Sequence, residues 1–111
     1  MNLTTTRVNG IAVLTVRETR LTFPVLPDLA AAATTLIAAG DARIVIDVAA
    51  VGYVDSAAIG CLMDLYRQTT SAGGMLKLAG VQRRVETMLT MTGAHHFLEV
   101  HADANTAIAS F

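Results

Sequence analysis

The fold is decided by the stretch Arg43-Ile44-Val45-Ile46-Asp47-Val48, a short apolar run with several β-branched residues. Such a run is typical of a strand that is covered on both faces. A loop follows it, and a helical pattern then extends from about Ala57 to Thr70. The inner face of that helix is marked at i, i+3, i+4 and i+7 by Ile59, Leu62, Met63 and Tyr66. The stretch therefore predicts a core strand joined to an amphipathic helix.

The segment before this unit predicts a hairpin and another helix. Val8-Asn9-Gly10 is a typical turn between two apolar runs, and the second run, Ile11–Val16, is rich in β-branched residues. Phe23 to Ala39 has apolar residues at the spacing of one helix face, with Pro24 and Pro27 near its first turn. Gly40 stands where a left-handed helix C-cap is expected.

The segment after this unit repeats the alternation of strand and helix. Met75–Ala79 predicts a third core strand, and Val85, Met88 and Leu89 mark a helix that ends near Gly93. Phe97–Val100 predicts a last strand, and Ala102–Phe111 a short closing helix. The order is therefore β-β-α-β-α-β-α-β-α, which favours a mainly parallel sheet with right-handed crossovers. We expect one α/β domain with about four helices over residues 1–111.

Length and composition limit the classes of function. The chain has 111 residues, 53% of them hydrophobic, which suits one compact domain. Its formal net charge is −1 and it has no basic run, so the electrostatic features of a nucleic-acid binder are missing. Cys61 is the single cysteine, so no intramolecular disulfide is possible and a reducing compartment is the simpler assumption. We expect a cytoplasmic monomer that binds no nucleic acid.

Direct membrane insertion is not expected either. The N-terminal residues Met1–Arg7 lack the long apolar core of a signal peptide. The longest weakly charged stretch, Phe23 to Gly40, contains two prolines and Asp28 and has helical periodicity. These features favour an amphipathic helix over a membrane span.

Asp55-Ser56 lies where open α/β sheets place their binding sites, beyond the carboxyl end of a strand and at the start of a helix. Ser56 is a typical N-cap, and its hydroxyl is expected to accept a hydrogen bond from a free N–H of the first turn. The alternative is that Ser56 is phosphorylated, which adds about −1.5 to −2 charges near pH 7. A helix N-terminus tolerates an anion, so this charge would act mainly on a docked partner.

The residues around this turn resemble a known family. Val51–Gly60, with the sequence VGYVDSAAIG, resembles the signature of anti-sigma-factor antagonists in the STAS superfamily, which is an apolar residue, Asp, Ser, Ser or Thr, Gly, Leu and Gly. Thr22–Leu26 resembles the entry to that family's first helix, Gly74–Leu78 its later strand, and Val85–Gly93 the helix that ends in Thr-Gly or Ser-Gly. The similarity covers nearly the whole chain in order and spacing, which implies the STAS fold.

The resemblance implies a function in the regulation of transcription. In that family the serine directly after the aspartate is the phosphorylation site, and it corresponds to Ser56. The unphosphorylated protein binds an anti-sigma factor, which is often also the serine kinase, and a sigma factor is thereby released. Phosphorylation by that kinase, with its own ATP, ends the binding, and a phosphatase restores it. The resemblance thus implies a ligand and kinase substrate rather than an enzyme.

Two features depart from the family's pattern. Ala57 replaces the usual second hydroxyl residue, and Ala58 replaces the usual glycine, which often lets a partner's backbone approach closely. The family commonly has Gly-Glu-apolar-Asp at the end of the strand around Val16, with that aspartate near the serine. The corresponding residues here are Val16-Arg17-Glu18-Thr19, so the acid is absent from its usual place and Arg17 and Arg20 flank the gap. Glu18 could substitute only if the local register shifts.

These observations give one candidate partner-binding surface, made of the turn, the start of the next helix and the segment beside them: Asp55, Ser56, Ala57, Ala58, Gly60, Arg17, Glu18, Thr19, Arg20 and Thr22. The first hypothesis is an anti-sigma-factor antagonist that sequesters an anti-sigma factor/serine kinase and is switched off by phosphorylation at Ser56. Small solitary STAS proteins also resemble accessory subunits of lipid-transporting ABC systems. The second hypothesis is therefore a subunit that clamps an ABC ATPase without a phosphoswitch.

The other chemically active side chains do not favour catalysis. The histidines His95, His96 and His101 have no cysteine or acid at a ligand spacing, so we expect surface histidines and no metal. Cys61 lies near an apolar helix face and is expected to be a buried, inert thiol. Neither a Gly-x-Ser-x-Gly elbow nor a Gly-x-x-x-x-Gly-Lys loop occurs. We expect no enzyme activity and no cofactor. Core filling is the default role for Met63, Met75, Met88 and Met91, and any that are exposed could instead form an adaptable docking surface.

Overall fold

The chain begins with a β-hairpin, and the computed structural model describes every residue from 1 to 111. Strands β1 (Leu3–Val8) and β2 (Ile11–Val16) are antiparallel and are joined by Asn9-Gly10. Both turn residues have a positive φ, 53° for Asn9 and 77° for Gly10, which is the geometry of a two-residue type I′ hairpin turn. The predicted opening hairpin is confirmed.

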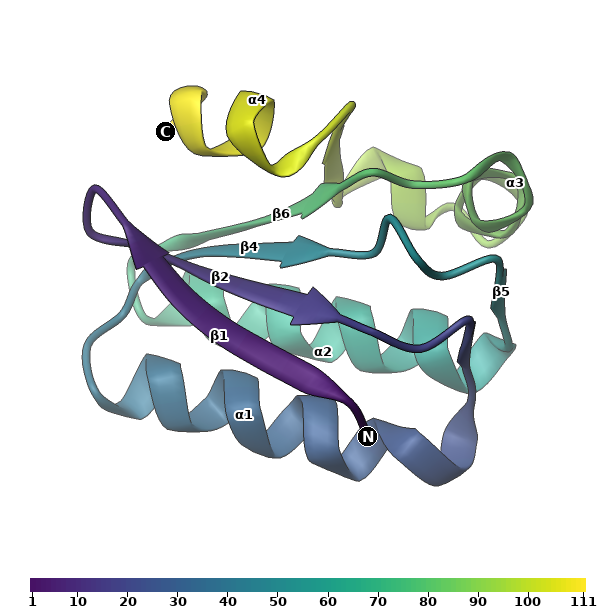
Figure 1. The fold of residues 1–111 in the computed structure, drawn as a ribbon, viewed down its shortest axis with the longest axis horizontal. Coiled ribbons are helices and arrows are strands. Elements are labelled where there is room, and N and C mark those ends of the chain that lie inside the picture. Colours follow the sequence, from purple (N-terminus) through teal and green to yellow (C-terminus); the bar gives the residue numbers. More distant parts are fainter.

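The main sheet has five strands in the order β1-β2-β4-β6-β7. Figure 1 shows the first four of them side by side. Its other members are β4 (Arg43–Asp47), β6 (Met75–Ala79) and β7 (Glu99–His101). Every pair beyond the hairpin is parallel. The prediction of an α/β domain with a mixed, mainly parallel sheet is therefore confirmed.

Helices lie on both faces of this sheet. α1 (Leu26–Ala38) and α2 (Ser56–Ser71) cover one face, and α4 (Ala104–Ala109) lies against the other (Figure 1). α3 (Arg83–Met91) follows β6, and a 3₁₀ turn, η2 (Ala94–His96), leads from it toward β7. None of the helices reaches the length and apolarity that a bilayer crossing needs.

The predicted first helix, Phe23–Ala39, is divided into two parts. Phe23–Val25 form a 3₁₀ turn, η1, and the α-helix proper begins at Leu26. A proline stands in the first two positions of each part, where its missing N–H leaves no helical hydrogen bond unmade. Gly40 has φ of 94°, in agreement with the predicted left-handed end of this helix.

The side chains of β4 point alternately to the two faces of the sheet, and each face has its own apolar core. Ile44 and Ile46 face the main apolar cluster under α1, α2 and α3, whereas Val45 faces a smaller cluster under α4. All three side chains have no exposed surface. This arrangement confirms the prediction of a strand covered on both faces. Burial of such side chains contributes about 1.5–3 kcal/mol each.

A second, two-stranded sheet was not predicted. β3 (Arg20–Leu21) follows β2 in the chain and precedes η1, and β5 (Tyr53–Val54) follows β4 and precedes α2. The two short strands pair in parallel with each other. Leu21 and Val54 are buried in the main core. Strands of two residues are too short to show an alternating pattern in the sequence. This small sheet brings the Arg17–Thr22 segment beside the start of α2.

Two predictions near the C-terminal half are corrected. The expected strand Phe97–Val100 begins only at Glu99, because Phe97 ends η2 with its side chain 54% exposed. Met91 was expected in the core, but it is 76% exposed on α3. Met63 and Met88 do pack against the main core, as expected.

Lys77 on β6 is a buried charge that fastens α4 to the sheet. Its side chain is 6% exposed, and its Nζ lies 2.8 Å from Glu99 Oε2. The same Nζ donates to Ser110 Oγ at 2.6 Å and stands 4.3 Å from the centre of the Phe111 ring. His101 Nε2 lies 2.7 Å from the same Glu99 oxygen. The charge is thus paired and hydrogen-bonded, as a buried ammonium requires.

Candidate functional site

The start of α2 is built around Asp55. Its Oδ1 accepts a hydrogen bond from the Ala58 N–H at 2.8 Å, and its Oδ2 accepts one from the Phe23 N–H at 2.9 Å. The first bond caps α2 and the second caps η1, so one carboxylate satisfies free backbone donors at two helix starts. Asp55 therefore ties the beginning of the first helical segment to the beginning of the second.

Ser56 is not the N-cap, which corrects the expectation from the sequence. The N-cap is Asp55, whose backbone is extended, and Ser56 is the first residue of α2. The Ser56 side chain is exposed. Because Asp55 performs the capping, the Ser56 hydroxyl is not needed to hold the helix start together. It stands at the surface beside the free N–H groups of the first turn.

The segment from Arg17 to Thr22 lies next to this turn. β3 pairs Arg20 with Tyr53 and Leu21 with Val54, and the Gly52 N–H donates to the Thr19 carbonyl at 2.9 Å. The guanidinium of Arg20 stands 4.4 Å from the centre of the Tyr53 ring, a cation–π contact. Thr22 precedes η1 in an extended conformation. The structure thus brings Thr19, Arg20 and Thr22 close to Asp55.

Arg17 and Glu18 belong instead to the junction with the N-terminus. The Arg17 N–H donates to the Asn2 carbonyl at 2.8 Å. Glu18 Oε1 accepts from the Asn2 N–H at 3.0 Å, so this carboxylate is bound by the residue that precedes β1.

Three small residues follow Ser56, and each has a different environment. Ala57 is half-buried, Ala58 has no exposed surface and belongs to the main core, and Gly60 is exposed. The Ala58 methyl is thus buried inside the domain, which removes Ala58 from the expected surface. A Cβ on Gly60 would meet no atom within 4 Å. Nothing inside the domain therefore requires a glycine at this position.

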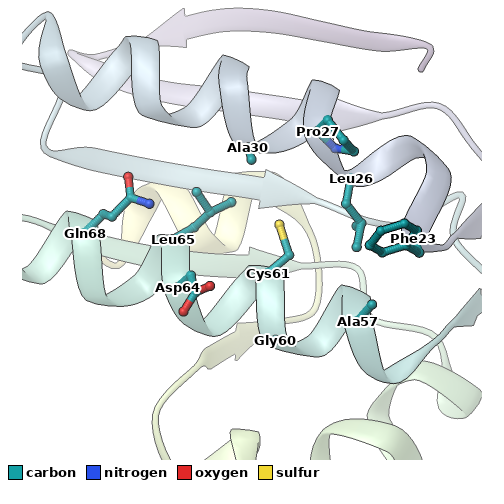
Figure 2. Close-up of a pocket in the computed structure, with 10 residues that line it drawn as sticks. All are labelled: Phe23, Leu26, Pro27, Ala30, Ala57, Gly60, Cys61, Asp64, Leu65 and Gln68. Atoms are coloured by element: carbon teal, nitrogen blue, oxygen red, sulfur yellow. The ribbon is translucent and has the colours of Figure 1, made fainter.

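A groove between α1 and α2 runs beside this turn (Figure 2). It encloses about 410 Å³ and is lined by Phe23, Leu26, Pro27, Ala30, Ala57, Gly60, Cys61, Asp64, Leu65 and Gln68. Phe23 is 70% exposed although it is a large apolar residue. Sequence reasoning missed both the groove and the exposure of Phe23, because helical spacing does not reveal how far two helices stand apart.

Cys61 is part of this groove and is half-buried rather than buried. Its side chain points from α2 toward α1 (Figure 2). Burial raises the pKa of the Cys61 thiol, and the nearby Asp64 carboxylate raises it further. The thiol therefore stays protonated near neutral pH, which makes it a weak nucleophile.

The three histidines lie in two separate elements, η2 and β7. His95 and His96 belong to η2, and His95 Nδ1 lies 3.3 Å from the Leu89 carbonyl oxygen. His101 lies on β7 beside Glu99 and Ser110. No group of three or more histidine, cysteine, aspartate or glutamate side chains stands close enough together to hold a metal ion.

Comparisons with solved structures agree with this architecture. An anti-sigma factor antagonist from Mycobacterium paratuberculosis is 17% identical, with a TM-score of 0.87 over 98% of this chain and 92% of that one. A STAS domain anti-sigma-factor antagonist from Planctomyces limnophilus is 16% identical, with a TM-score of 0.86 over 97% and 95%. The phosphorylated form of the Bacillus cell fate determinant SpoIIAA is 16% identical, with a TM-score of 0.76 over 98% of each chain.

No curated protein matches the chain. At these identities the structural likeness establishes the fold. The family model for the STAS domain matches residues 2–107, which is nearly the entire sequence. The chain therefore belongs to the STAS domain family.

Proposed function

We propose that this protein is an anti-sigma-factor antagonist of the cytoplasm, whose partner-binding surface is centred on Ser56. In this proposal the unphosphorylated form sequesters an anti-sigma factor that is also a serine kinase. Phosphorylation of Ser56 then ends the binding. The proposal is supported by the structural likeness to anti-sigma-factor antagonists and by the arrangement around Asp55.

The observation that carries the proposal is the division of labour between Asp55 and Ser56. Asp55 makes both capping hydrogen bonds, and the Ser56 side chain is exposed at the first position of α2. A kinase can reach the exposed Ser56 hydroxyl. Phosphorylation of this hydroxyl would remove neither of the hydrogen bonds that Asp55 accepts. The domain would therefore keep its fold when Ser56 carries a phosphate.

A phosphate on Ser56 would change the surface more than the interior. It would add about −1.5 to −2 charges next to the Asp55 carboxylate. The positive end of the α2 dipole and its free N–H groups would offset part of this charge within the domain. A partner that buries the same surface would have to desolvate the phosphate, which is costly for an unpaired ion. Binding would therefore weaken while the domain remains folded.

Gly60 supports the same surface from one helical turn away. Residues i and i+4 are neighbours on a helix, so Gly60 lies beside Ser56. Glycine inside a helix costs about 0.5–1 kcal/mol relative to alanine, and no contact within the domain explains it here. We infer that the open space above Gly60 receives the backbone of the partner.

The groove continues this surface toward α1. Phe23, Ala57 and Gly60 all line it, and the backbone of Phe23 is fixed by its hydrogen bond to Asp55. An aromatic side chain that is 70% exposed next to an apolar groove is a typical anchor of a protein–protein interface. The proposed surface therefore combines an apolar part at Phe23 with a switch at Ser56.

The experiment that tests this function is an affinity capture of the native chain from its own cell extract, read by mass spectrometry. We expect capture of an ATP-binding serine kinase, and phosphate on Ser56 in the portion of the chain that is not bound. The matched control is Ser71, which is an exposed serine at the last position of the same helix. Phosphate on Ser71 but not on Ser56 would contradict the proposed switch.

A second candidate function is an accessory subunit of a lipid-transporting ABC system. It is favoured by the hydrogen bond from the Asn2 N–H to Glu18, which directs this carboxylate to the start of β1. On this hypothesis the domain clamps the ATPase and Ser56 stays unmodified. Capture of an ABC ATPase in the same experiment, with no phosphate on Ser56, would support this function over the first.

A further inference from the structure

β1 lies at an edge of the five-stranded sheet and pairs only with β2 (Figure 1). Proteins usually protect such an edge with lysines, a proline, a bulge or a covering element. β1 has none of these, because its register with β2 is continuous and Thr4, Thr5 and Thr6 are uncharged and β-branched. Its one charge, Arg7, is paired with Asp41 at 2.7 Å. The edge is therefore open to another strand.

The register of the hairpin shows which backbone groups of β1 are free. The Asn2 carbonyl accepts from the Arg17 N–H at 2.8 Å, so Asn2 points its backbone groups toward β2. Along an antiparallel strand, the backbone N–H and C=O groups of successive residues point alternately toward the paired strand and away from it. Thr4, Thr6 and Val8 therefore bond to β2, and the N–H and C=O groups of Leu3, Thr5 and Arg7 point outward.

These outward groups are self-complementary around Thr5. If a second copy approaches with its β1 antiparallel, Thr5 faces Thr5 of the second copy, and Leu3 faces Arg7 at each end. Each of these facing pairs can exchange two N–H···O=C bonds. The two Arg7 side chains then stand about 14 Å apart, since four residues of strand separate them. That distance exceeds the Debye length at physiological salt, so their repulsion is screened.

We propose that β1 pairs with β1 of a second copy and joins the two five-stranded sheets into one continuous sheet. The two-fold axis passes through Thr5 perpendicular to the sheet, and α1 and α2 of both copies lie on the same face. On this proposal the protein forms a dimer, whereas the sequence alone led us to expect a monomer. It uses no residue of the surface around Ser56, so each dimer carries two such surfaces.

Charged substitutions at Thr5 test the dimer, because Thr5 faces itself across the axis. Thr5→Lys and Thr5→Glu each place like charges directly opposite one another, which destabilises a strand pair. We expect each variant alone to have the monomer mass of 11.7 kDa in sedimentation velocity. An equimolar mixture is expected to return to twice that mass, like the wild type at high concentration.

A control variant and a second readout keep the test independent of folding. In the proposed register Thr6 faces Thr4 of the second copy, so Thr6→Lys is expected to weaken the dimer less than Thr5→Lys. In wild-type protein, amide exchange at Leu3, Thr5 and Arg7 should slow as concentration rises, while exchange at Thr4, Thr6 and Val8 stays constant. A wild-type mass of 11.7 kDa at millimolar concentration, or equal association by Thr5→Lys and wild type, would overturn the proposal.

Discussion

Asp55 and Ser56 are adjacent, but the structure gives them separate tasks. The Asp55 carboxylate accepts from Ala58 and from Phe23, and so it holds α2 and η1 in their relative positions. The Ser56 side chain is exposed and takes no part in this arrangement. A phosphate on Ser56 would therefore leave both capping hydrogen bonds of Asp55 in place.

Asp55→Ala is expected to destabilise the domain by about 1–3 kcal/mol, because two backbone donors lose their acceptor. Urea unfolding followed by circular dichroism measures the change. Asp55→Asn is the matched control, since its single amide oxygen can replace one of the two acceptors, and it should lie between Ala and wild type. An Asp55→Ala variant as stable as wild type would show that the two caps are not required.

Gly60→Ala is expected to have opposite effects on stability and binding. The domain should gain about 0.5–1 kcal/mol, because alanine is the better helix former and its methyl meets no neighbour. Affinity for the captured partner should fall, because the methyl fills the space proposed for the partner's backbone. Gly74→Ala is the contrasting control, since a Cβ there would collide with the Ala42 carbonyl and destabilise the domain. Unchanged partner affinity in Gly60→Ala would remove Gly60 from the surface.

At this scale the sequence located the turn but not the roles within it. Aspartate and serine are both preferred N-caps, so their types could not decide which one begins α2. The position at which α2 begins also decides which of its side chains face the core. With Asp55 as the N-cap, Ala58 is buried and Ser56 is exposed. The bond from Phe23 to Asp55 joins residues 32 positions apart and left no local pattern in the sequence.

At the scale of the elements, a groove lies between α1 and α2, and Phe23, in the η1 turn, lines this groove. The small β3–β5 sheet fixes the position of the segment that leads into η1. These short elements determine where the exposed aromatic ring lies relative to Ser56. They therefore define the shape of the proposed partner-binding surface.

Phe23→Ala is expected to weaken partner binding by about tenfold or more, as truncation of an aromatic interface anchor does. Its effect on stability should be small, because the ring is already 70% exposed in the free domain. Leu29→Ala on the inner face of α1 is the contrasting variant. Leu29 has no exposed surface, so its truncation should cost about 2–5 kcal/mol in the free energy of unfolding. Partner affinity of Phe23→Ala equal to that of wild type, measured by calorimetry, would exclude the groove from the interface.

The longer elements were predictable and the short ones were not. The sequence predicts β6 at Met75–Ala79, as found, and β4 within one residue, because buried parallel strands are continuous apolar runs. β3 and β5 have two residues each, and their pairing depends on contacts between Arg17–Thr22 and the loop after β4. Such pairing is a product of the tertiary fold and has no sequence period of its own.

For the whole molecule, the two faces of the sheet are stabilised differently. The face under α1, α2 and α3 has a core of 23 buried residues, whereas the face under α4 has five. The smaller core is supplemented by Lys77 and its contacts with Glu99, Ser110 and Phe111. The attachment of α4 therefore depends on charge as well as on apolar burial, and it should respond to pH.

Acid is expected to destabilise this attachment. The hydrogen bonds from His101 and Lys77 lower the pKa of Glu99 below its ordinary value of 4.5. A carboxyl with a lowered folded-state pKa contributes stability above its unfolded-state pKa and loses it as pH falls through the folded-state value. Thermal unfolding from pH 7 to pH 3 should therefore show a falling Tm in the acid range.

The fall in Tm should be shallower for Glu99→Gln than for Glu86→Gln, an exposed control on α3. Identical acid profiles for these two variants would contradict this role of Glu99.

The central claim is that charge on Ser56 ends partner binding without disturbing the fold, and calorimetric titration of the captured partner with Ser56→Asp tests it most directly. Ser71→Asp, which adds the same charge at the other end of α2, is the matched control. We expect both variants to keep the wild-type circular dichroism spectrum. Ser56→Asp should lose at least about tenfold in affinity, while Ser71→Asp binds like wild type. Equal affinities of Ser56→Asp and wild type would contradict the account.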